Sequence, residues 1–256
     1  MPKLSKEHKF LDLSDYGRPI ARLFANSLKN TAVTPLHVTF CFLAAGLLAA
    51  FYIFSERYLL AGICLVVKSI LDAADGELAR AKQKPSLIGR FLDSILDLLL
   101  NLLILTSICL ITNGSLLVLA AAFFSIQLQG TVFNYYYTIL RNRSEGGDTT
   151  SRIEERGAPQ ALHGESQKMV NFLFAIYRLL YGIFDEIMLA LDGTARQVKI
   201  LPGWFLTLVS VYGLGFQLLI IAIMLNLSLD DYVLAFFNCY SVLIVVIVGT
   251  RKICLR

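Results

Sequence analysis

The sequence contains few charged residues for its length. Asp, Glu, Lys and Arg make up only 16% of its 256 residues, whereas soluble domains carry about 25%. Hydrophobic residues make up 56% of the chain, and the mean hydropathy is +0.65. A soluble fold of this length cannot bury so much apolar surface. The composition therefore excludes an ordinary soluble domain and indicates a membrane protein.

Paired metal-binding or disulfide-forming residues are also missing. Five cysteines are scattered along the chain without a C-x-x-C pair, so we expect them to be apolar packing residues. His37 and His163 have no second His or Cys at zinc-ligand spacing. These absences exclude zinc, haem and a disulfide framework. The N-terminus also lacks the apolar core and cleavage site of a signal peptide, so we expect it to remain in the mature protein.

Long apolar runs, in contrast, are abundant. A helix that crosses a bilayer needs about 20 predominantly apolar residues. Six runs with few charges approach or reach this length, and they predict an all-α membrane protein with six transmembrane helices. The predicted spans are Val38–Phe54, Tyr58–Ile70, Ser94–Ile111, Leu116–Leu140, Phe205–Leu227 and Val233–Gly249.

Lys and Arg are distributed unevenly between the two sides that six spans define. The N-terminus, the connections after the second and fourth spans, and the C-terminus are basic, whereas Arg57 is the one cation in the outer turns. The last outer turn carries Asp230 and Asp231. Because loops rich in Lys and Arg remain cytoplasmic, we expect both termini and the candidate site described below to face the cytoplasm.

Residues 1–30 are expected to form a separate interfacial segment. Between Phe10 and Leu28, apolar residues recur at roughly the helical period, with Arg18 and Arg22 between them. This pattern is typical of an amphipathic helix that lies in the headgroup layer. Residues 31–256 then form the transmembrane catalytic domain.

Two later segments have two interpretations each. Met169–Leu191 is apolar enough to span, but it contains Arg178, Asp185 and Glu186, and a seventh span would place the basic C-terminus outside. We interpret it as an interfacial or re-entrant helix, with a seventh span as the alternative. The polar insert at 141–167 is either a solvated connector, as most loops are, or a lid over the site.

Four aspartates interrupt the ends of two apolar runs. Asp72 and Asp75 follow the second predicted span at i,i+3 spacing, and Asp93 and Asp97 begin the third at i,i+4 spacing. Each pair therefore lies on one face of its helix, and antiparallel packing would turn the two faces together. Carboxylates in membrane helices are costly and usually functional. The alternative, pairing with a nearby cation such as Lys68, explains one aspartate more readily than four.

Four neighbouring carboxylates raise one another's pKa unless cations neutralise them. Mg²⁺ and Mn²⁺ prefer oxygen ligands, and two such ions are a recurrent device for phosphodiester chemistry. The spacing therefore predicts a site for two divalent ions, Mg²⁺ or Mn²⁺, that handles phosphate groups. Gly76, Ala79 and Gly89 leave the helix faces bare for a nucleotide, and Arg80 offers donors to phosphate oxygens.

The string from Asp72 to Asp97 resembles the signature of the CDP-alcohol phosphotransferase family, D-x-x-D-G-x-x-A-R-x8-G-x3-D-x3-D. All eight fixed residues are present at the family's spacing. A second segment, Thr34 to Thr39, is similar to the family's T-P-N-x-x-T, although Leu36 stands where asparagine is common. The resemblance implies a homodimeric membrane enzyme of phospholipid synthesis. Such an enzyme moves a substituted phosphoryl group from a CDP-alcohol to an acceptor alcohol and releases CMP.

The resemblance also implies roles for single residues. Asp72, Asp75 and Asp93 would bind two metals around the diphosphate of the substrate. Asp97 would lie beside the metals as a fourth carboxylate and act as the general base. The implied contacts to the CDP moiety are Pro35, Thr39, Asp72, Asp75, Gly76, Ala79, Arg80 and Gly89.

The acceptor site has weaker signals. Arg141 and Arg143 are the candidates for binding a phosphate on the acceptor, with contact to anionic headgroups as the alternative. Polar residues within the predicted spans either bond between helices or line the acceptor pocket. They are Gln127, Gln129, Asn134, Tyr135, Tyr136, Tyr137, Gln217 and Asn238.

Three functions are compatible with these observations. The first is transfer of a phosphatidyl group from CDP-diacylglycerol to a polar alcohol, and the second is transfer from CDP-choline or CDP-ethanolamine to diacylglycerol. The third is a cation or solute transporter, but transporters usually bind ions at the bilayer midplane, whereas these aspartates gather at one face. We expect a CDP-linked substrate, an acceptor alcohol and membrane lipids as partners, and no nucleic acid.

Overall fold

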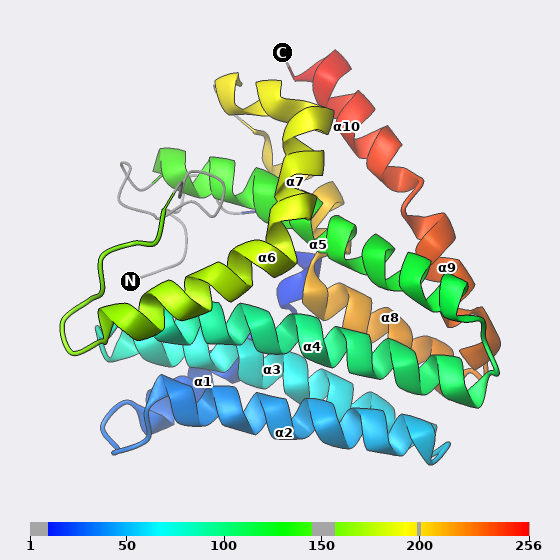
Figure 1. The fold of residues 1–256 in the computed structure, drawn as a ribbon, viewed down its shortest axis with the longest axis horizontal. Helices are drawn as coiled ribbons and strands as arrows, with labels where there is room; N and C mark the ends of the chain where they lie inside the picture. Colours follow the sequence, from blue (N-terminus) through cyan, green and yellow to red (C-terminus); the bar gives the residue numbers. More distant parts are fainter. Residues whose placement is uncertain (1–9, 145–156, 199–200, 256) are drawn as a thin grey trace.

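The computed structural model describes residues 10–144, 157–198 and 201–255, and these residues form helices and no strands. The all-α class of membrane protein is therefore confirmed. Figure 1 shows α2 (Pro35–Phe54), α3 (Tyr58–Ala81) and α4 (Leu87–Ile111) side by side along the long axis, with α1 (Arg18–Leu28) against α3.

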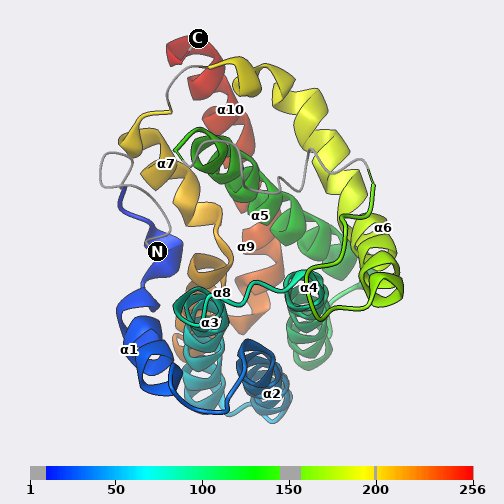
Figure 2. The same ribbon diagram turned by 90° about the vertical axis from the view of Figure 1, so that its left-hand side faces the viewer.

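The second half of the chain covers one side of these helices. Figure 2 looks toward the ends of α2, α3 and α4, with α5 and α6 on one side of them. In this arrangement α8 packs on α3, and α5 packs on α4, α6 and α9. The helices of this half are α5 (Leu116–Ser144), α6 (Gln167–Asp192), α7 (Gly203–Val209), α8 (Leu214–Asn226), α9 (Val233–Tyr240) and α10 (Leu243–Cys254). Single 3₁₀ turns are η2 (Leu13–Asp15), η3 (Gly193–Gln197), η4 (Ser210–Tyr212) and η5 (Asp230–Tyr232).

Local capping sets the starts of the two helices at the cytoplasmic end of the predicted topology. Thr34 and His37 form a capping box at the start of α2, and Pro35 occupies the first turn, where its missing N–H is harmless. The hydroxyl of Ser86 accepts a hydrogen bond of 2.8 Å from the amide of Gly89 at the start of α4. Because α4 begins there, its first three turns carry the third and fourth aspartates.

The two larger apolar clusters are built mostly from segments other than the acidic ends of α3 and α4. One cluster contains Leu65 of α3, Ile104 and Ile108 of α4, and Leu225 of α8, all fully buried. A second cluster joins α5, α7 and α10. The first uses the halves of α3 and α4 that do not carry the acidic motif. Smaller apolar clusters, between α4 and α6 and between α1 and α3, cover the faces of the acidic ends that point away from the aspartates.

The count of six spans is not confirmed. Four segments are long and apolar enough to cross a membrane, namely 35–54, 87–111, 116–141 and 230–254, and the pair 203–212 and 214–226 makes five if it is one bent span. The second predicted span is absent from this set because α3 includes charged residues from Lys68 onward. With 24 residues, α3 is about 36 Å long at 1.5 Å per residue.

The predicted span Phe205–Leu227 is broken. α7 and α8 meet at an angle of 51°, with η4 and Gly213 between them. A Cβ atom on Gly215 would lie 2.0 Å from the backbone oxygen of Ser14. Because Gly215 has no side chain, the N-terminal turn η2 can lie directly against the start of α8.

The other interfacial predictions are resolved in part. The segment predicted over Met169–Leu191 is a single helix, α6, which is not among the apolar candidates for a span. α1 is amphipathic: Ala21 and Ala25 are buried against α3, while Ile20 and Leu23 are exposed. Residues 145–156 of the polar insert at 141–167 lie outside the described residues.

Candidate active site

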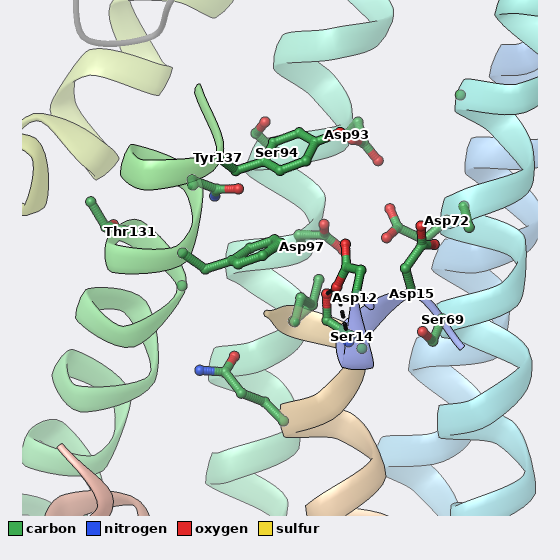
Figure 3. A pocket seen from close by; sticks show the side chains of 18 of the residues that line it. Asp12, Ser14, Asp15, Ser69, Asp72, Asp93, Ser94, Asp97, Thr131 and Tyr137 are labelled. Carbon is green, nitrogen blue, oxygen red and sulfur yellow. Dashed lines mark hydrogen bonds between the residues drawn. The ribbon is translucent and has the colours of Figure 1, made fainter. Parts of the chain in front are cut away.

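Two helix faces bring the aspartates together. Asp72 and Asp75 come from α3, and Asp93 and Asp97 come from α4. Figure 3 shows Asp72, Asp93 and Asp97 around one pocket, which all four aspartates line. One carboxylate oxygen from each of Asp72, Asp75 and Asp93 lies within 4.8 Å of the other two. The grouping expected from the helical spacing is therefore present.

The three grouped carboxylates fit a divalent cation. Oδ1 of Asp93 is buried and has no hydrogen-bond partner, which is costly for a polar atom. The neighbouring oxygens come from Asp72 and Asp75, and like charges at this range repel one another. A hard cation with oxygen ligands would supply the missing partner and balance the charge. These three residues would hold it.

Thr39 supports this group from outside the pocket. Its hydroxyl donates a buried hydrogen bond of 2.8 Å to Oδ2 of Asp75, and it also lies 3.2 Å from the carbonyl oxygen of Pro35. Thr39 and Pro35 are not among the residues that line the pocket. Thr39 therefore orients Asp75, and its predicted contact to the nucleotide stays a prediction.

Asp97 has a different environment from the other three. It lines the pocket one helical turn beyond Asp93, and its Oδ1 accepts a hydrogen bond from Nζ of Lys68. Lys68 is fully buried, with Nζ 5.2 Å from the centre of the Phe42 ring. The four carboxylates thus divide into a group of three and one that is paired with a lysine.

The pocket around the aspartates has a volume of about 530 Å³. Its cationic lining residues include Arg80, Arg90 and Arg141. Its uncharged lining is rich in amides and hydroxyls, namely Asn101, Gln127, Thr131, Asn134, Thr138 and Gln217. The amide nitrogen of Gln127 is buried and has no hydrogen-bond partner. The pocket therefore offers both cations and neutral hydrogen-bonding groups to a polar ligand.

The N-terminal turn η2 closes one side of the pocket, and the sequence reasoning missed it. Asp12, Ser14 and Asp15 line the pocket beside the aspartates of the motif (Figure 3). The backbone nitrogen of Leu13 donates a 3.0 Å hydrogen bond to the hydroxyl of Ser210. A sequence signal was present, because Asp12 and Asp15 have the same i,i+3 spacing as the first motif pair, but nothing local shows what they face.

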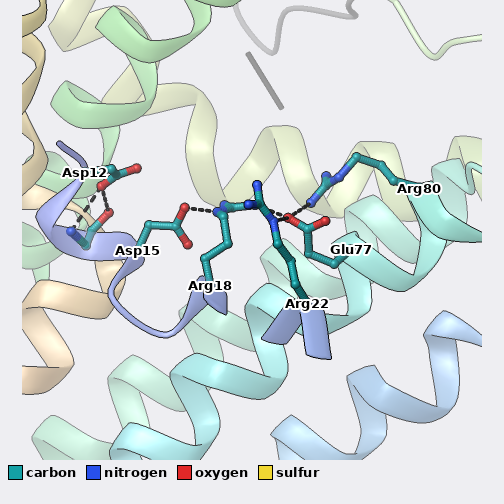
Figure 4. Close-up of polar contacts among 7 residues, drawn as sticks. Asp12, Asp15, Arg18, Arg22, Glu77 and Arg80 are labelled. Atoms are coloured by element: carbon teal, nitrogen blue, oxygen red, sulfur yellow. Dashed lines mark hydrogen bonds and ion pairs between the residues drawn. The ribbon is translucent and has the colours of Figure 1, made fainter. Parts of the chain in front are cut away.

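A chain of ion pairs connects η2 and α1 to the motif helix (Figure 4). Arg18 bonds to Asp15 and, at 2.5 Å, to Glu77. Glu77 lies inside the motif and also pairs with Arg80 at 3.2 Å and Arg22 at 3.4 Å. Glu77 therefore fixes the N-terminal segment to α3 and orients the guanidinium of Arg80 at the pocket.

The remaining predicted residues are only partly brought together. Gly76 and Arg80 line the pocket, whereas Ala79 and Gly89 do not; the Gly89 amide caps α4 instead. Arg141 lines the pocket, and the side chain of Arg143 lies outside the described part of α5.

The polar residues of the predicted spans divide as expected between pocket and packing. Gln127, Asn134, Tyr137 and Gln217 line the pocket. The others bond between elements: Gln129 to the carbonyl oxygen of Phe237, Tyr135 and Tyr136 to Asp192, and Asn238 to Ser125.

Comparison with known families agrees with this site. The model of the CDP-alcohol phosphatidyltransferase family matches residues 32–209, which include α2 to α6, the whole acidic motif and most of the pocket lining. The chain belongs to this family. It is therefore a membrane transferase of substituted phosphate groups in phospholipid synthesis, and the transporter interpretation is set aside.

Two curated relatives are similar over the family region. Archaetidylinositol phosphate synthase of Pyrococcus horikoshii is 34% identical over 143 residues, which are 55% of this chain and 71% of the relative. The bifunctional IPC transferase and DIPP synthase of Thermococcus kodakarensis is 31% identical over 153 residues, 59% of this chain but 34% of the relative. The second relative is thus a much longer protein that shares one part with this chain.

Proposed function

We propose that the protein transfers a lipid-substituted phosphoryl group from a CDP-linked lipid, such as CDP-diacylglycerol, to a polar acceptor alcohol. In this reaction the acceptor oxygen forms a bond to the lipid-bearing phosphorus, and the bond from that phosphorus to CMP breaks. The acceptor proton moves to the carboxylate of Asp97. The observation that carries the proposal is the grouping of Asp72, Asp75 and Asp93 within 4.8 Å at the pocket that Asp97 also lines.

The residues of the pocket have distinct tasks in this reaction. Asp72, Asp75 and Asp93 hold two divalent ions, Mg²⁺ or Mn²⁺, which neutralise phosphate charge when bound. Gly76 leaves open space on the α3 face for the nucleotide. The nearest atoms to a Cβ placed on Gly76 would belong to the guanidinium of Arg80, at 3.6 Å. Arg80 lies at the pocket to bind the diphosphate.

The acceptor is proposed to be a hydroxyl-rich alcohol that carries a phosphate. Arg90 and Arg141 line the pocket with the cationic charge that a phosphate requires. The side-chain amide nitrogen of Gln127 is buried and lacks a hydrogen-bond partner in the protein. A hydroxyl of the acceptor would accept its hydrogen bond. The relative named as a synthase of archaetidylinositol phosphate supports this class of acceptor.

Topology and assembly belong to the same proposal. The site faces the cytoplasm, and the enzyme works as a homodimer. Membrane-impermeant labelling should modify a cysteine at Arg57 from outside but a cysteine at Lys84 only after permeabilisation. Cross-linking in native membranes should give a dimer band, and a strictly monomeric active species would contradict the assembly.

A substrate panel tests the reaction. Purified protein with Mg²⁺ or Mn²⁺ is incubated with labelled CDP-diacylglycerol and, separately, inositol phosphate, glycerol phosphate and serine, and CMP and the lipid product are measured. CDP-choline with diacylglycerol is run in parallel as the other donor polarity. We expect product with a phosphorylated polyol. Product only from CDP-choline would reverse the donor assignment, and CMP release without any acceptor dependence would contradict transfer.

A further inference from the structure

Lys68 is a buried cation that neither the acidic motif nor the proposed reaction explains. It lies on α3 one helical turn before Asp72, and its side chain is 0% exposed. A buried charge is costly unless it is paired, and charged residues inside membrane proteins are usually functional. The position of Lys68 therefore calls for a specific partner.

That partner is Asp97. Nζ of Lys68 on α3 donates to Oδ1 of Asp97 on α4. The Phe42 ring lies 5.2 Å from Nζ, and Phe42 is itself fully buried, so the ammonium is held between a carboxylate and an aromatic face. Both neighbours of Lys68 restrict where its ammonium can lie, and the ammonium in turn restricts the Asp97 carboxylate.

The same contact explains why only three of the four motif aspartates gather. Within the described residues, Asp72, Asp75 and Asp93 are the carboxylates close enough to share a cation, and Asp97 is not in that group. Asp97 is on the same helix as Asp93 at i,i+4 spacing, so helix geometry alone would allow it to join. Of the four carboxylates, that of Asp97 is the one that accepts a hydrogen bond from Lys68.

We propose that Lys68 is a positioning residue that holds Asp97 as the base and keeps its carboxylate out of the cation-binding group. Lys68 touches neither the substrate nor the reacting atoms and acts through Asp97. The inference rests on the proposed function, in which Asp97 receives the acceptor proton. One lysine outside the motif thus makes the role of Asp97 different from the roles of the other three aspartates.

The test is a double-mutant cycle of Lys68→Met and Asp97→Asn, measured both by turnover and by Mn²⁺ binding. Met keeps the length and the apolar contacts of Lys68 without its charge. We expect Lys68→Met to lower kcat about 10²-fold, as a misplaced group of this kind can, while KM for the CDP-linked donor is unchanged. The double variant should be no slower than Asp97→Asn alone, because Lys68 acts through Asp97.

Mn²⁺ binding, followed by electron paramagnetic resonance without substrate, supplies a readout that is independent of turnover. Lys68→Met should bind Mn²⁺ several times more tightly, because Asp97 is released to join Asp72, Asp75 and Asp93. The gain should disappear when Asp97→Asn is also present. A gain that persists in the double variant would show a general effect of removing positive charge, and it would overturn the inference.

Controls separate this inference from the proposed function. Cys64→Ala, one turn earlier on α3 and outside the pocket, should leave kcat and Mn²⁺ affinity unchanged. If Lys68→Met does not fold, Lys68→Gln removes the charge but keeps a donor, and the same cycle applies. Normal kcat in the Lys68 variant, or additive losses in the double variant, would contradict a role through Asp97. Normal kcat in Asp97→Asn alone would instead contradict the proposed base.

Discussion

Two acids of this protein, Asp192 and Asp93, have opposite surroundings. Asp192, at the end of α6, is 1% exposed and accepts hydrogen bonds of 2.6 Å from both Tyr136 and Nε of Arg251. Its backbone oxygen accepts a further bond of 2.7 Å from Tyr135. Asp93 instead lies beside other carboxylates at a cavity, and its Oδ1 has no partner.

The comparison distinguishes a structural acid from a functional one. The Asp192 network is complete within the protein, so it fixes α5, α6 and α10 against one another and leaves no atom for a ligand. The carboxylates around Asp93 are incomplete within the protein, and a bound cation would complete them. Asp192 is buried and Asp93 is half-buried at the cavity, and it is the partners of each acid that indicate its role.

Replacement at the incomplete site should have the largest effect on activity. Asp93→Asn removes one of three grouped charges, and we expect transfer to fall by about 10²–10⁴-fold or more, the range seen for loss of a catalytic group. Thermal unfolding in EDTA should be unchanged or shifted upward, because repulsion with Asp72 and Asp75 is relieved. CMP release and unfolding are measured on the same preparation. Retained activity would show that Asp93 is not essential to the site.

Replacement at the complete site should act on stability instead. Arg251→Met leaves Asp192 buried without its cation, which should lower the free energy of unfolding by about 3–5 kcal/mol. Turnover per folded molecule should stay near that of the wild type. Unfolding in detergent and CMP release are compared with Lys252→Met, an exposed neighbour. Loss of activity with unchanged unfolding would remove the distinction between the two acids.

A third acid, Glu165, should give the smallest effect and a defined pH dependence. It accepts hydrogen bonds from the Ser86 hydroxyl at 2.7 Å and the Ile88 amide at 3.1 Å. Burial raises the pKa of Glu165, but these bonds and those from the Leu162 and Leu87 amides outweigh burial and lower the pKa below its ordinary value. Because the folded state has the lower pKa, the stabilisation is complete above the unfolded pKa and is lost as the pH falls through the folded one.

Glu165→Gln should therefore destabilise the start of α4 by about 0.5–2 kcal/mol at neutral pH, as loss of a helix cap does. The difference from the wild type should shrink as the pH is lowered through the acidic range. Unfolding measured at several pH values checks this. An equal difference at every pH would show that the charge of Glu165 does not contribute.

The fold and the core of the site could be predicted because their signals are local. Apolar runs and helical spacing located α2, α4 and α5, and they placed Asp72 and Asp75 opposite Asp93 and Asp97. Charge patterns also located α1 and α6. In each case the residues that decide the structure lie within one or two helical turns of one another.

The missed features depend on contacts between distant parts of the chain. The break between α7 and α8 lies where Ser14 approaches Gly215, a contact about which the apolar sequence of that run says nothing. Lys68 was noted only as a cation near the motif, because its pairing with Asp97 depends on where the fold places α4 relative to α3. The predicted span Tyr58–Ile70 is the apolar part of a longer helix, since α3 continues through its charged residues to Ala81.

The central claim is that the incomplete group of acids holds divalent ions for transfer from a CDP-linked lipid. The most direct measurement is CMP release by the purified wild-type enzyme in EDTA and again after Mg²⁺ or Mn²⁺ is restored, with Asp93→Asn and Arg251→Met beside it. We predict no release in EDTA, recovery with either ion for the wild type and for folded Arg251→Met, and none for Asp93→Asn. Full turnover in EDTA would contradict the claim.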